Sequence, residues 1–489
     1  MQLEAVAHIT TAKVWQNLGQ VVQHAGVAYI DWPLTSLVGS IIAEITGLDL
    51  FHVATIVTLV VATMIGIGSY LFFLVIFQSN LYAALACLLV IIGNLTMIIY
   101  YKPGQIAIMF VVFFLLLLVR KGTLTSPSHI ILALLLLMGT TITHVHTSMF
   151  FFFILLGLWI FALLKRNQET RPDLISLTLF FIIPIFWVVY WGTSGFSAVS
   201  RWSWTNFQGA LFKPEWLSSV ISMGQANFGS APPEWYRITR LFWLVLLYAM
   251  GGLLLLRGLT RFRRLKFPES WLCAAFVGVG ILGILSCLTS PLGLGELKRI
   301  TTYIPLFTAP LLLLFLRRFK QSVANVGLVT LAIVLGLFSF PSFLTNNSQI
   351  NSNSYHPIEF SAGEWLQSLY GTGAGLNIFA TAATYQPIQY YLFNASFQAE
   401  RQTHEFKGGW VAAGLWDSMN DLVNRFNDTL FPNTIFIYSP KDTLERSMSF
   451  NIPYDDPHWA AMSAQLSNTH STIYNNGLIL VYSNAGQRN

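Results

Sequence analysis

HVATIVTLVVATMIGIGSYLFFLVIF, residues 52–77, decides the structural class of this protein. The stretch contains no Asp, Glu, Lys or Arg. About 20 apolar residues are enough for a helix to cross the roughly 30 Å hydrocarbon layer of a bilayer. The stretch therefore predicts a transmembrane helix.

The whole chain has the composition of a membrane protein. Of its 489 residues, 54% are hydrophobic and only 10% are charged, and the mean hydropathy is +0.58. Soluble domains carry about 25% charged residues, so a soluble globular protein is excluded. Further apolar stretches bring the prediction to an all-α bundle of about ten transmembrane helices; they lie near 81–100, 104–119, 129–146, 148–164, 174–192, 238–256, 270–290, 300–316 and 322–343.

Basic residues follow alternate spans. In a bundle of ten spans, every one of these loops falls on the same side, which the positive-inside rule makes cytoplasmic. The N-terminal segment and everything after the last span are then extracytoplasmic. The loops concerned hold Arg120 and Lys121; Lys165, Arg166 and Arg171; Arg257, Arg261, Arg263, Arg264 and Lys266; and Arg317, Arg318 and Lys320.

Composition changes at about Asn346, where the apolar stretches end. From there onward the chain holds six Lys/Arg against eleven Asp/Glu, so the overall net charge of +6 belongs to the loops between spans. Those loops flank a membrane, and nucleic acid is not an expected partner. We predict three parts: an external segment over 1–50, a transmembrane domain over 51–344, and a soluble extracytoplasmic α/β domain over 345–489.

The first 50 residues are predicted to hold two short helices along the membrane surface. One covers 8–18 and ends at Gly19, and the other covers 34–46, after Pro33 and before Gly47. Residues 1–50 themselves show no signal peptide with a basic n-region and an apolar h-region. The simplest interpretation is that the chain lacks an earlier transmembrane helix.

The C-terminal region has the mixed pattern of an α/β domain. The residues Asn475-Asn476-Gly477 separate two short apolar runs and predict a β-hairpin. The predicted strands cover 377–382, 434–439, 471–474 and 478–482, and the predicted helices cover 360–370, 417–427 and 456–466.

Polar groups gather at the outer ends of the predicted spans. His144 and His146 lie where the fourth span meets the fifth, in the sequence His-Val-His-Thr-Ser. The pair suits hydrogen-bonded polar residues at a helix turn, a contact with substrate, or two ligands of a metal ion. A divalent metal ion is compatible with the sequence but not required by it.

Two cationic residues break the positive-inside pattern. Lys102, close to Gln105, and Arg299, close to Tyr303, both fall on the outer side. Such residues either extend their charge to outer headgroups or bind a phosphate, for which Arg is particularly suited. The acidic residues of the first external segment, which could supply a general base or a metal ligand, are Glu4, Asp31, Glu44 and Asp49.

The order of these motifs resembles GT-C-type membrane glycosyltransferases, in the group that includes relatives of dolichyl-phosphate-mannose mannosyltransferases. The resemblance covers nearly the whole chain and rests on order and spacing. It is carried by His8, Ala12, Gly19, Tyr29-Ile30-Asp31-Trp32-Pro33 and Ile45-Thr46-Gly47-Leu48, by Tyr101-Lys102-Pro103-Gly104-Gln105, by Thr143-His144 and Thr147-Ser148, by Arg299, Tyr303 and Pro305, and by Tyr474-Asn475-Asn476-Gly477 with Val481-Tyr482.

The resemblance implies transfer of a sugar, with inversion, from a polyprenyl-phosphate donor to a glycan or protein acceptor outside the cytoplasm. Glu4 or Asp31 would be the catalytic base, and Arg299 with Lys102 would hold the lipid phosphate. Gln105, His144, His146 and Tyr303 would contact the substrates. The family's base lies just after its first transmembrane helix, and Glu4 is the residue at the corresponding place here.

Two other classes of function compete with the enzyme. A coupled transporter would carry ionisable residues near the middle of its spans and internal repeats, and neither is evident in the sequence. A non-catalytic envelope scaffold, related to these enzymes but binding partners through its soluble domain, is the second alternative.

Overall fold

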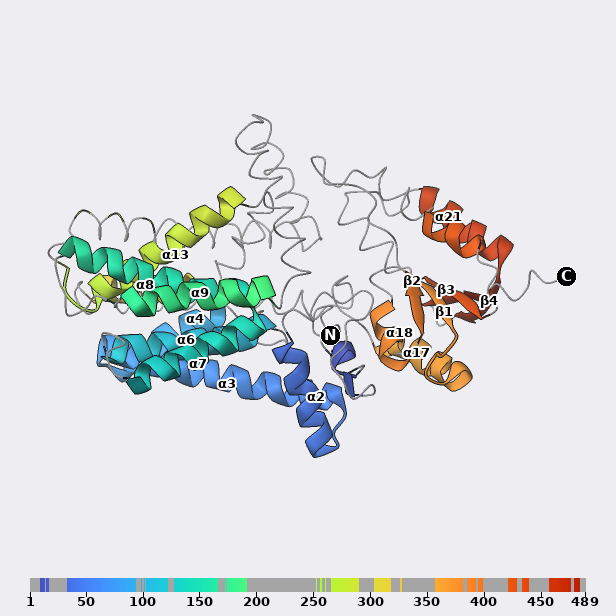
Figure 1. Ribbon diagram of the computed structural model, residues 1–489, viewed down its shortest axis with the longest axis horizontal. Helices are drawn as coiled ribbons and strands as arrows, with labels where there is room; N and C mark the ends of the chain where they lie inside the picture. The colour runs from blue at the N-terminus through green and yellow to red at the C-terminus, as the bar shows by residue number, and fades with distance from the viewer. Residues whose placement is uncertain are drawn as a thin grey trace, which may run out of the picture.

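The computed structural model consists of a helical part and a smaller α/β part (Figure 1). It describes residues 9–13, 15–16, 33–93, 98, 101, 103–121, 127–165, 172, 174–190, 252, 256, 260, 265–289, 303–317, 326–327, 357–380, 385–392, 395–398, 421–428, 433–438, 457–475 and 479–483.

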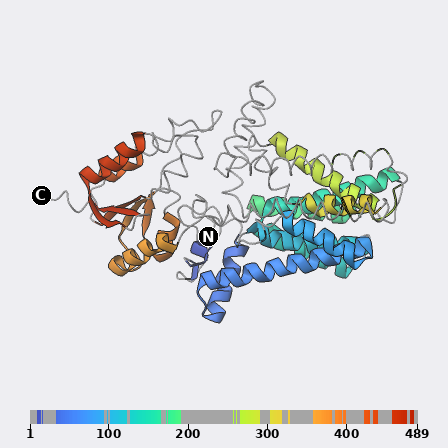
Figure 2. The same ribbon diagram turned by 180° about the vertical axis from the view of Figure 1, so that it is seen from behind.

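Apolar helices make up the helical part. They pack side by side, apart from the short helix α2, which projects from the start of α3 (Figures 1 and 2). The elements are α2 (Leu34–Thr46), α3 (Leu50–Phe77), α4 (Asn80–Gly93), α6 (Pro103–Lys121), α7 (Pro127–Thr143), α8 (Val145–Lys165), α9 (Leu174–Tyr190), α13 (Glu269–Thr289) and α15 (Pro305–Leu316).

Three of the described helices are long and apolar enough to cross a membrane, over Leu50–Phe77, Pro103–Arg120 and Thr147–Leu164. Helices α4, α7, α9, α13 and α15 occupy five more of the predicted ranges. The ranges 238–256 and 322–343 fall almost entirely outside the described residues. The structure therefore supports a helical membrane protein, while the number of ten spans stays a prediction.

Local chain chemistry explains how α2 and α3 meet. Gly47 ends α2 in the left-handed conformation, with φ 68°, and its N–H donates to the Ala43 carbonyl. Asp49 then begins α3, because its side chain accepts a hydrogen bond from the Phe51 N–H. The predicted helix over 34–46, with Gly47 just after it, is confirmed.

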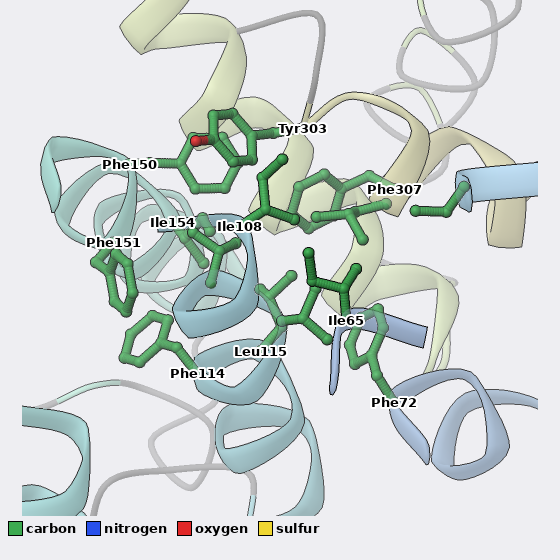
Figure 3. Close-up of a cluster of buried hydrophobic side chains, with 14 of the residues drawn as sticks. Ile65, Phe72, Ile108, Phe114, Leu115, Phe150, Phe151, Ile154, Tyr303 and Phe307 are labelled. Atoms are coloured by element: carbon green, nitrogen blue, oxygen red, sulfur yellow. The ribbon is translucent and has the colours of Figure 1, made fainter. Parts of the chain in front are cut away.

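The helices share one large apolar core, and aromatic rings fill much of it. Phe114 lies 4.1 Å from Phe151, centroid to centroid, and 5.4 Å from Phe180 (Figure 3). Helices α8 and α13 approach one another still more closely. A Cβ atom added at Gly278 would lie 1.9 Å from the Phe153 carbonyl oxygen, so only glycine fits this crossing.

Contacts between helices establish their relative directions. Gln105 near the start of α6 contacts the Thr58 carbonyl, and Gly68, further along α3, lies against Val112, so α3 and α6 run parallel. Thr147 contacts Tyr303, and Phe150, further along α8, contacts Phe307, so α8 and α15 also run parallel.

The last residues of these helices lie at one end of the bundle. The Arg317 guanidinium at the end of α15 approaches the Phe77 carbonyl at the end of α3, at 3.5 Å. Helix α13 runs antiparallel to α8, because Gly157 and Phe153 contact Ala274 and Gly278 in reverse order. We call this the basic end, because Arg120, Lys121, Lys165 and Arg317 lie at the ends of helices there and Lys266 lies just before α13.

The opposite end, where α3, α6, α8 and α15 begin, is called the polar end. Its described polar residues include Asp49, Tyr101, Gln105, His144 and Tyr303. Basic residues at one end of the bundle and polar residues at the other agree with the loop charges, which predict that all the basic loops share one side. Which end faces the cytoplasm stays a prediction.

The C-terminal residues form a five-stranded mixed sheet with strand order β2-β1-β3-β5-β4. Strands β1 and β3 pair in parallel, with Phe379 opposite Phe436, whereas β3 and β5 are antiparallel. The elements are α17 (Pro357–Tyr370), β1 (Asn377–Ala380), α18 (Tyr385–Tyr391), β2 (Ser396–Gln398), β3 (Thr434–Tyr438), α21 (Pro457–Thr469), β4 (Ser471–Asn475) and β5 (Leu480–Ser483).

Alternating side chains bury both faces of this sheet. Ile378 and Ile435 pack on one face against Leu366 of α17, whereas Phe436 packs on the other against Leu466 of α21 and Phe426. The result is a three-layer α/β/α arrangement, as predicted in outline. The β4–β5 hairpin and the strands at 377 and 434 are confirmed, while β2 and α18 were not predicted.

Candidate functional site

The turn between α7 and α8 places a histidine at the polar end. Helix α7 ends at Thr143 and α8 begins at Val145, so the break lies at His144 itself. The sequence had predicted the break after His146. The His144 N–H donates to the Thr140 carbonyl, and the His144 carbonyl accepts from the Thr147 N–H at 3.0 Å. These bonds continue the backbone ladder through the break and fix the imidazole at the start of α8.

A chain of hydrogen bonds joins this turn to α15. The His144 Nδ1 lies 2.8 Å from the Thr147 hydroxyl oxygen, which lies 2.7 Å from the Tyr303 hydroxyl oxygen. Thr147 and Tyr303 are both buried. A threonine hydroxyl donates one hydrogen bond and accepts two, so Thr147 can couple the imidazole to the phenol. The structure thus brings together His144 and Tyr303, two residues predicted to bind substrate.

Aromatic packing sets the orientation of the Tyr303 ring. The ring lies against Phe150 of α8, with centroids 4.4 Å apart, and its hydroxyl oxygen points across the Phe150 ring (Figure 3). Phe150 also contacts Phe307, one helical turn further along α15. The Tyr303 phenol is therefore held by contact of its ring with the Phe150 ring and by a hydrogen bond between its hydroxyl group and Thr147.

Gln105 is fully buried at the start of α6. Its Nε2 donates to the Thr58 carbonyl at 2.9 Å and to the Ile98 carbonyl, which fixes the amide orientation. Its Oε1 accepts no hydrogen bond from the described residues. A buried acceptor left without a donor costs about 1–3 kcal/mol, so this oxygen is suited to accept a hydrogen bond from a hydroxyl group.

Tyr101 links the loop before α6 to helix α2. Its hydroxyl donates to the Thr35 carbonyl, and the ring is buried. Gly39 permits this contact, because a Cβ atom there would lie 2.6 Å from the Tyr101 hydroxyl oxygen. The polar end therefore contains side-chain hydrogen bonds on three sides: at α2, at the α7–α8 turn and at α15.

The α/β part attaches to the helical part at this same end. The Tyr390 hydroxyl of α18 donates to Asp49 Oδ2 at 2.9 Å, while Asp49 Oδ1 caps α3. The Phe51 ring lies 5.1 Å from Phe360 of α17 and 5.0 Å from Tyr390. The Lys13 ammonium lies 5.8 Å from the centre of the Tyr390 ring. We call these five residues the Asp49 joint.

Burial raises the pKa of the Tyr390 phenol, and the negative charge of Asp49, which accepts its hydrogen bond, raises it further. The phenol therefore stays protonated and keeps donating over the physiological pH range. The sequence did not predict this joint. An Asp directly before a long apolar stretch does indicate a helix N-cap, but nothing in the local sequence indicates its partner 341 residues away.

The other predicted site residues are only partly placed. Glu4, Asp31, Lys102 and Arg299 lie outside the described residues. His146 lies in the first turn of α8, and its side chain is not described. Glu44, another carboxylate of the external segment, accepts a hydrogen bond from Gln16 Nε2 at 3.1 Å.

Metal ligands do not cluster in the part of the chain that the structure describes: no group of three or more His, Cys, Asp and Glu side chains lies close enough to hold an ion. The polar end instead offers hydroxyl, imidazole and amide groups, which suit binding of a polar headgroup or a sugar. Comparison with protein families finds no family model that matches the chain, and comparison with curated proteins finds no match either.

Proposed function

We propose that the protein is an integral membrane glycosyltransferase that transfers a sugar from a polyprenyl-phosphate donor to an extracytoplasmic acceptor, with inversion at the anomeric carbon. The polar end is the catalytic end and faces away from the cytoplasm. The α/β part lies on the same side and contributes to the acceptor site. The order of sequence motifs supports the reaction class, and the geometry of the polar end supports the location.

The hydrogen-bonded chain from His144 through Thr147 to Tyr303 is the observation that carries this proposal. Thr147 and Tyr303 are buried and His144 is half-buried, and polar groups inside an apolar bundle are costly unless they are hydrogen-bonded. They lie at the end to which the Asp49 joint attaches the α/β part. Membrane-embedded polar groups and a water-exposed domain therefore meet at one place, as a lipid-linked donor and a water-soluble acceptor require.

In the proposed reaction, the acceptor hydroxyl oxygen attacks the anomeric carbon of the donor sugar. The carbon–oxygen bond to the phosphate breaks, and the polyprenyl phosphate leaves with the bonding electrons. Glu4 or Asp31 takes the acceptor proton, and Arg299 with Lys102 neutralises the phosphate. Gln105, His144, His146 and Tyr303 contact the sugars through hydrogen bonds.

The experiment is a transfer assay with the protein reconstituted in liposomes that contain polyprenyl-phosphate sugars. We expect Arg299→Ala to reduce turnover by about 10²-fold or more, since one lost stabilising contact to the leaving group has effects of this size. Tyr303→Phe removes one hydroxyl and is expected to cost about tenfold. Tyr82→Phe is the matched control, because it removes a tyrosine hydroxyl at the basic end, next to Arg317. Unchanged turnover in both Arg299→Ala and Tyr303→Phe would rule out the assigned site.

A non-catalytic envelope scaffold is the second candidate. It is favoured by one observation: both described carboxylates of the external segment, Glu44 and Asp49, are occupied by hydrogen bonds to protein groups. The scaffold predicts that Glu4→Gln and Asp31→Asn leave every measurable property unchanged. The enzyme predicts that one of the two abolishes transfer without changing donor binding.

Coupled ion transport receives no support from the described helices. Asp, Glu, Lys and Arg occur in α3, α4, α6, α7, α8, α9, α13 and α15 only at helix termini. Transporters of that class place such groups near the middle of the bilayer.

A further inference from the structure

Helix α2 buries hydroxyl side chains against the protein and exposes aliphatic ones, the reverse of a helix on a water-soluble surface. Thr35 and Ser36 are fully buried against the bundle, and Gly39 and Ala43 lie on the same face. The outward face carries Ile41, which is 48% exposed, and Ile45, which is 78% exposed; Leu48, just after the helix, is 43% exposed. Glu44, between the two isoleucines in the sequence, is exposed as well and accepts a hydrogen bond from Gln16.

Water does not favour this orientation. An amphipathic helix on a water-soluble surface buries its aliphatic side chains and exposes its hydroxyl groups. A helix resting on a membrane surface turns its polar face to water and its apolar face to the acyl chains. Helix α2 fits neither case, because protein covers its polar face. The more apolar face, with Ile41 and Ile45, is the one left open, which favours an apolar medium around it.

The buried face of α2 is closely fitted to its neighbours. The Tyr101 hydroxyl donates to the Thr35 carbonyl, and Gly39 leaves no room for a side chain beside that hydroxyl. Rotating α2 to bury its isoleucines would break this contact. The orientation is therefore determined by specific packing.

The outward face of α2 continues the apolar surface of α3. Only Gly47, Leu48 and Asp49 separate the two helices. Helix α3 is long and apolar enough to span a membrane. Its exposed apolar side chains begin at Ile56, Leu59 and Val60, after the exposed His52 in the first turn. Figure 2 shows α2 beside the first turns of α3, at the outside of the bundle. The same lipid layer can therefore contact both helices.

The length and connection of α2 limit how deep it can lie. Thirteen residues span about 20 Å as a helix, which is too short to cross the roughly 30 Å hydrocarbon layer. Asp49 begins α3 and bonds to Tyr390 of the α/β part, so the end of α2 lies at the membrane–water boundary.

We propose that α2 is inserted among the lipid acyl chains of the leaflet at the polar end, with Ile41, Ile45 and Leu48 in contact with lipid. Its polar face packs on the protein and separates Thr35, Ser36 and Tyr101 from the bilayer. The inference concerns only the surroundings of α2, and it holds whether or not the protein transfers sugars.

Site-specific fluorescence quenching tests this proposal in the full-length protein. The native cysteines Cys87, Cys273 and Cys287 are replaced by alanine, single cysteines are introduced, and each is labelled with an environment-sensitive fluorophore. The proteins are reconstituted in phosphatidylcholine vesicles, with either a lipid-borne nitroxide near the headgroup or aqueous iodide as quencher. The test position is Ile45→Cys.

Two matched positions calibrate the measurement. Leu59→Cys lies on the exposed face of α3, with a leucine that is 63% exposed, and reports lipid. Leu369→Cys lies on α17 of the α/β part, with a leucine that is 57% exposed, and reports water. A monodisperse elution profile, compared with that of the cysteine-free parent, confirms that each variant folds.

We expect the lipid nitroxide to quench the label at position 45 about threefold or more strongly than the label at 369, because the apolar face of an inserted helix lies 5–10 Å below the headgroups. Iodide should show the opposite order. Iodide quenching at position 45 equal to that at 369 would place α2 in water and overturn the proposal. Protection from both quenchers would overturn it too, because it would mean that protein, such as a second copy of this chain, covers the isoleucines.

Discussion

The two ends of the helical bundle differ in the kind of polar group they carry. The basic end holds cationic residues at or next to helix termini: Arg120, Lys121, Lys165, Lys266 and Arg317. The polar end holds short side chains that bond to one another and to backbone carbonyls, such as Thr147 with Tyr303 and Tyr101 with Thr35. Charge at one end orients the chain in a membrane, whereas the internal bonds at the other end build a preorganised surface.

The two ends therefore have different structural requirements. Basic residues need no defined partner, because their effect depends on number and side. Hydrogen-bonded groups need defined neighbours, because an unpaired polar atom is costly when buried. The polar end is therefore the place where the tertiary structure, rather than composition, determines which groups lie together.

The largest expected effect is an all-or-none difference in labelling between the two ends. In the cysteine-free background, His52→Cys places a thiol at the polar end and Lys266→Cys places one at the basic end; both native side chains are exposed. A membrane-impermeant maleimide added to intact cells should label position 52 only, because the positive-inside rule puts the basic end in the cytoplasm. Permeabilised cells should show labelling at both positions. Labelling of position 266 alone in intact cells would invert the assignment of the two ends.

The second effect concerns the packing of α13 against α8, two helices that run between the two ends. Gly278→Ala should destabilise the bundle by about 1–3 kcal/mol or more, because the new methyl group meets the Phe153 carbonyl oxygen of α8. Gly280→Ala, in the same helix, is the control: no atom lies within 4 Å of its added Cβ. That variant should be neutral or slightly stabilised, since alanine favours a helix more than glycine does. Thermal unfolding in detergent measures both, and equal stability of the two variants would contradict the close crossing.

A smaller effect is expected at the Asp49 joint. Tyr390→Phe removes the hydroxyl that bonds to Asp49, and Asp49→Asn keeps a good N-cap for α3 while removing the charge. In a double-mutant cycle, the two should couple by about 1 kcal/mol, the usual size for one hydrogen bond to a partly buried group. Tyr391→Phe, which removes the neighbouring hydroxyl, serves as the control. Strict additivity of the Asp49 and Tyr390 changes would show that the bond does not join the two parts in solution.

The smallest effect is a pH dependence of the same joint. The pKa of the Tyr390 phenol is raised in the folded protein, chiefly by burial, whereas an unfolded tyrosine titrates near 10. The stabilisation is therefore complete below about pH 10 and is lost as the pH rises from there through the folded pKa. The difference in unfolding temperature between the native protein and Tyr390→Phe should shrink between about pH 9 and pH 11. A difference that stays constant over this range would mean that the phenol does not titrate with the joint.

Much of the helical part could be predicted, because each helix depends on the residues of its own segment. Apolar runs predicted the ranges of α3, α6 and α8, and Pro33 with Gly47 predicted the limits of α2. The break between α7 and α8 was misplaced by three residues. Thr140, Thr141 and Thr143 suit a helix interior here because their hydroxyls bond to carbonyls four residues earlier, so composition alone does not show where α7 ends.

The α/β part was predicted less completely. The hairpin after Asn475 has a strong turn signal, and the strand near Ile435 is a continuous apolar run. Strand β2 is only three residues long and exists because it pairs with β1, and α18 is a short helix that packs on α17. Neither has enough residues for a local pattern to appear.

The sequence by itself predicted a helical membrane protein, the loops that share a side, and an α/β region after about residue 345. Those properties depend on composition and on periodicity within single segments. The tertiary structure decided which polar groups meet: Thr147 with Tyr303, Tyr101 with Thr35, and Asp49 with Tyr390. It also decided that the threonine face of α2 is buried and its isoleucine face is open. The physical reason is that these contacts join residues tens to hundreds of positions apart, whose pairing depends on how whole helices pack.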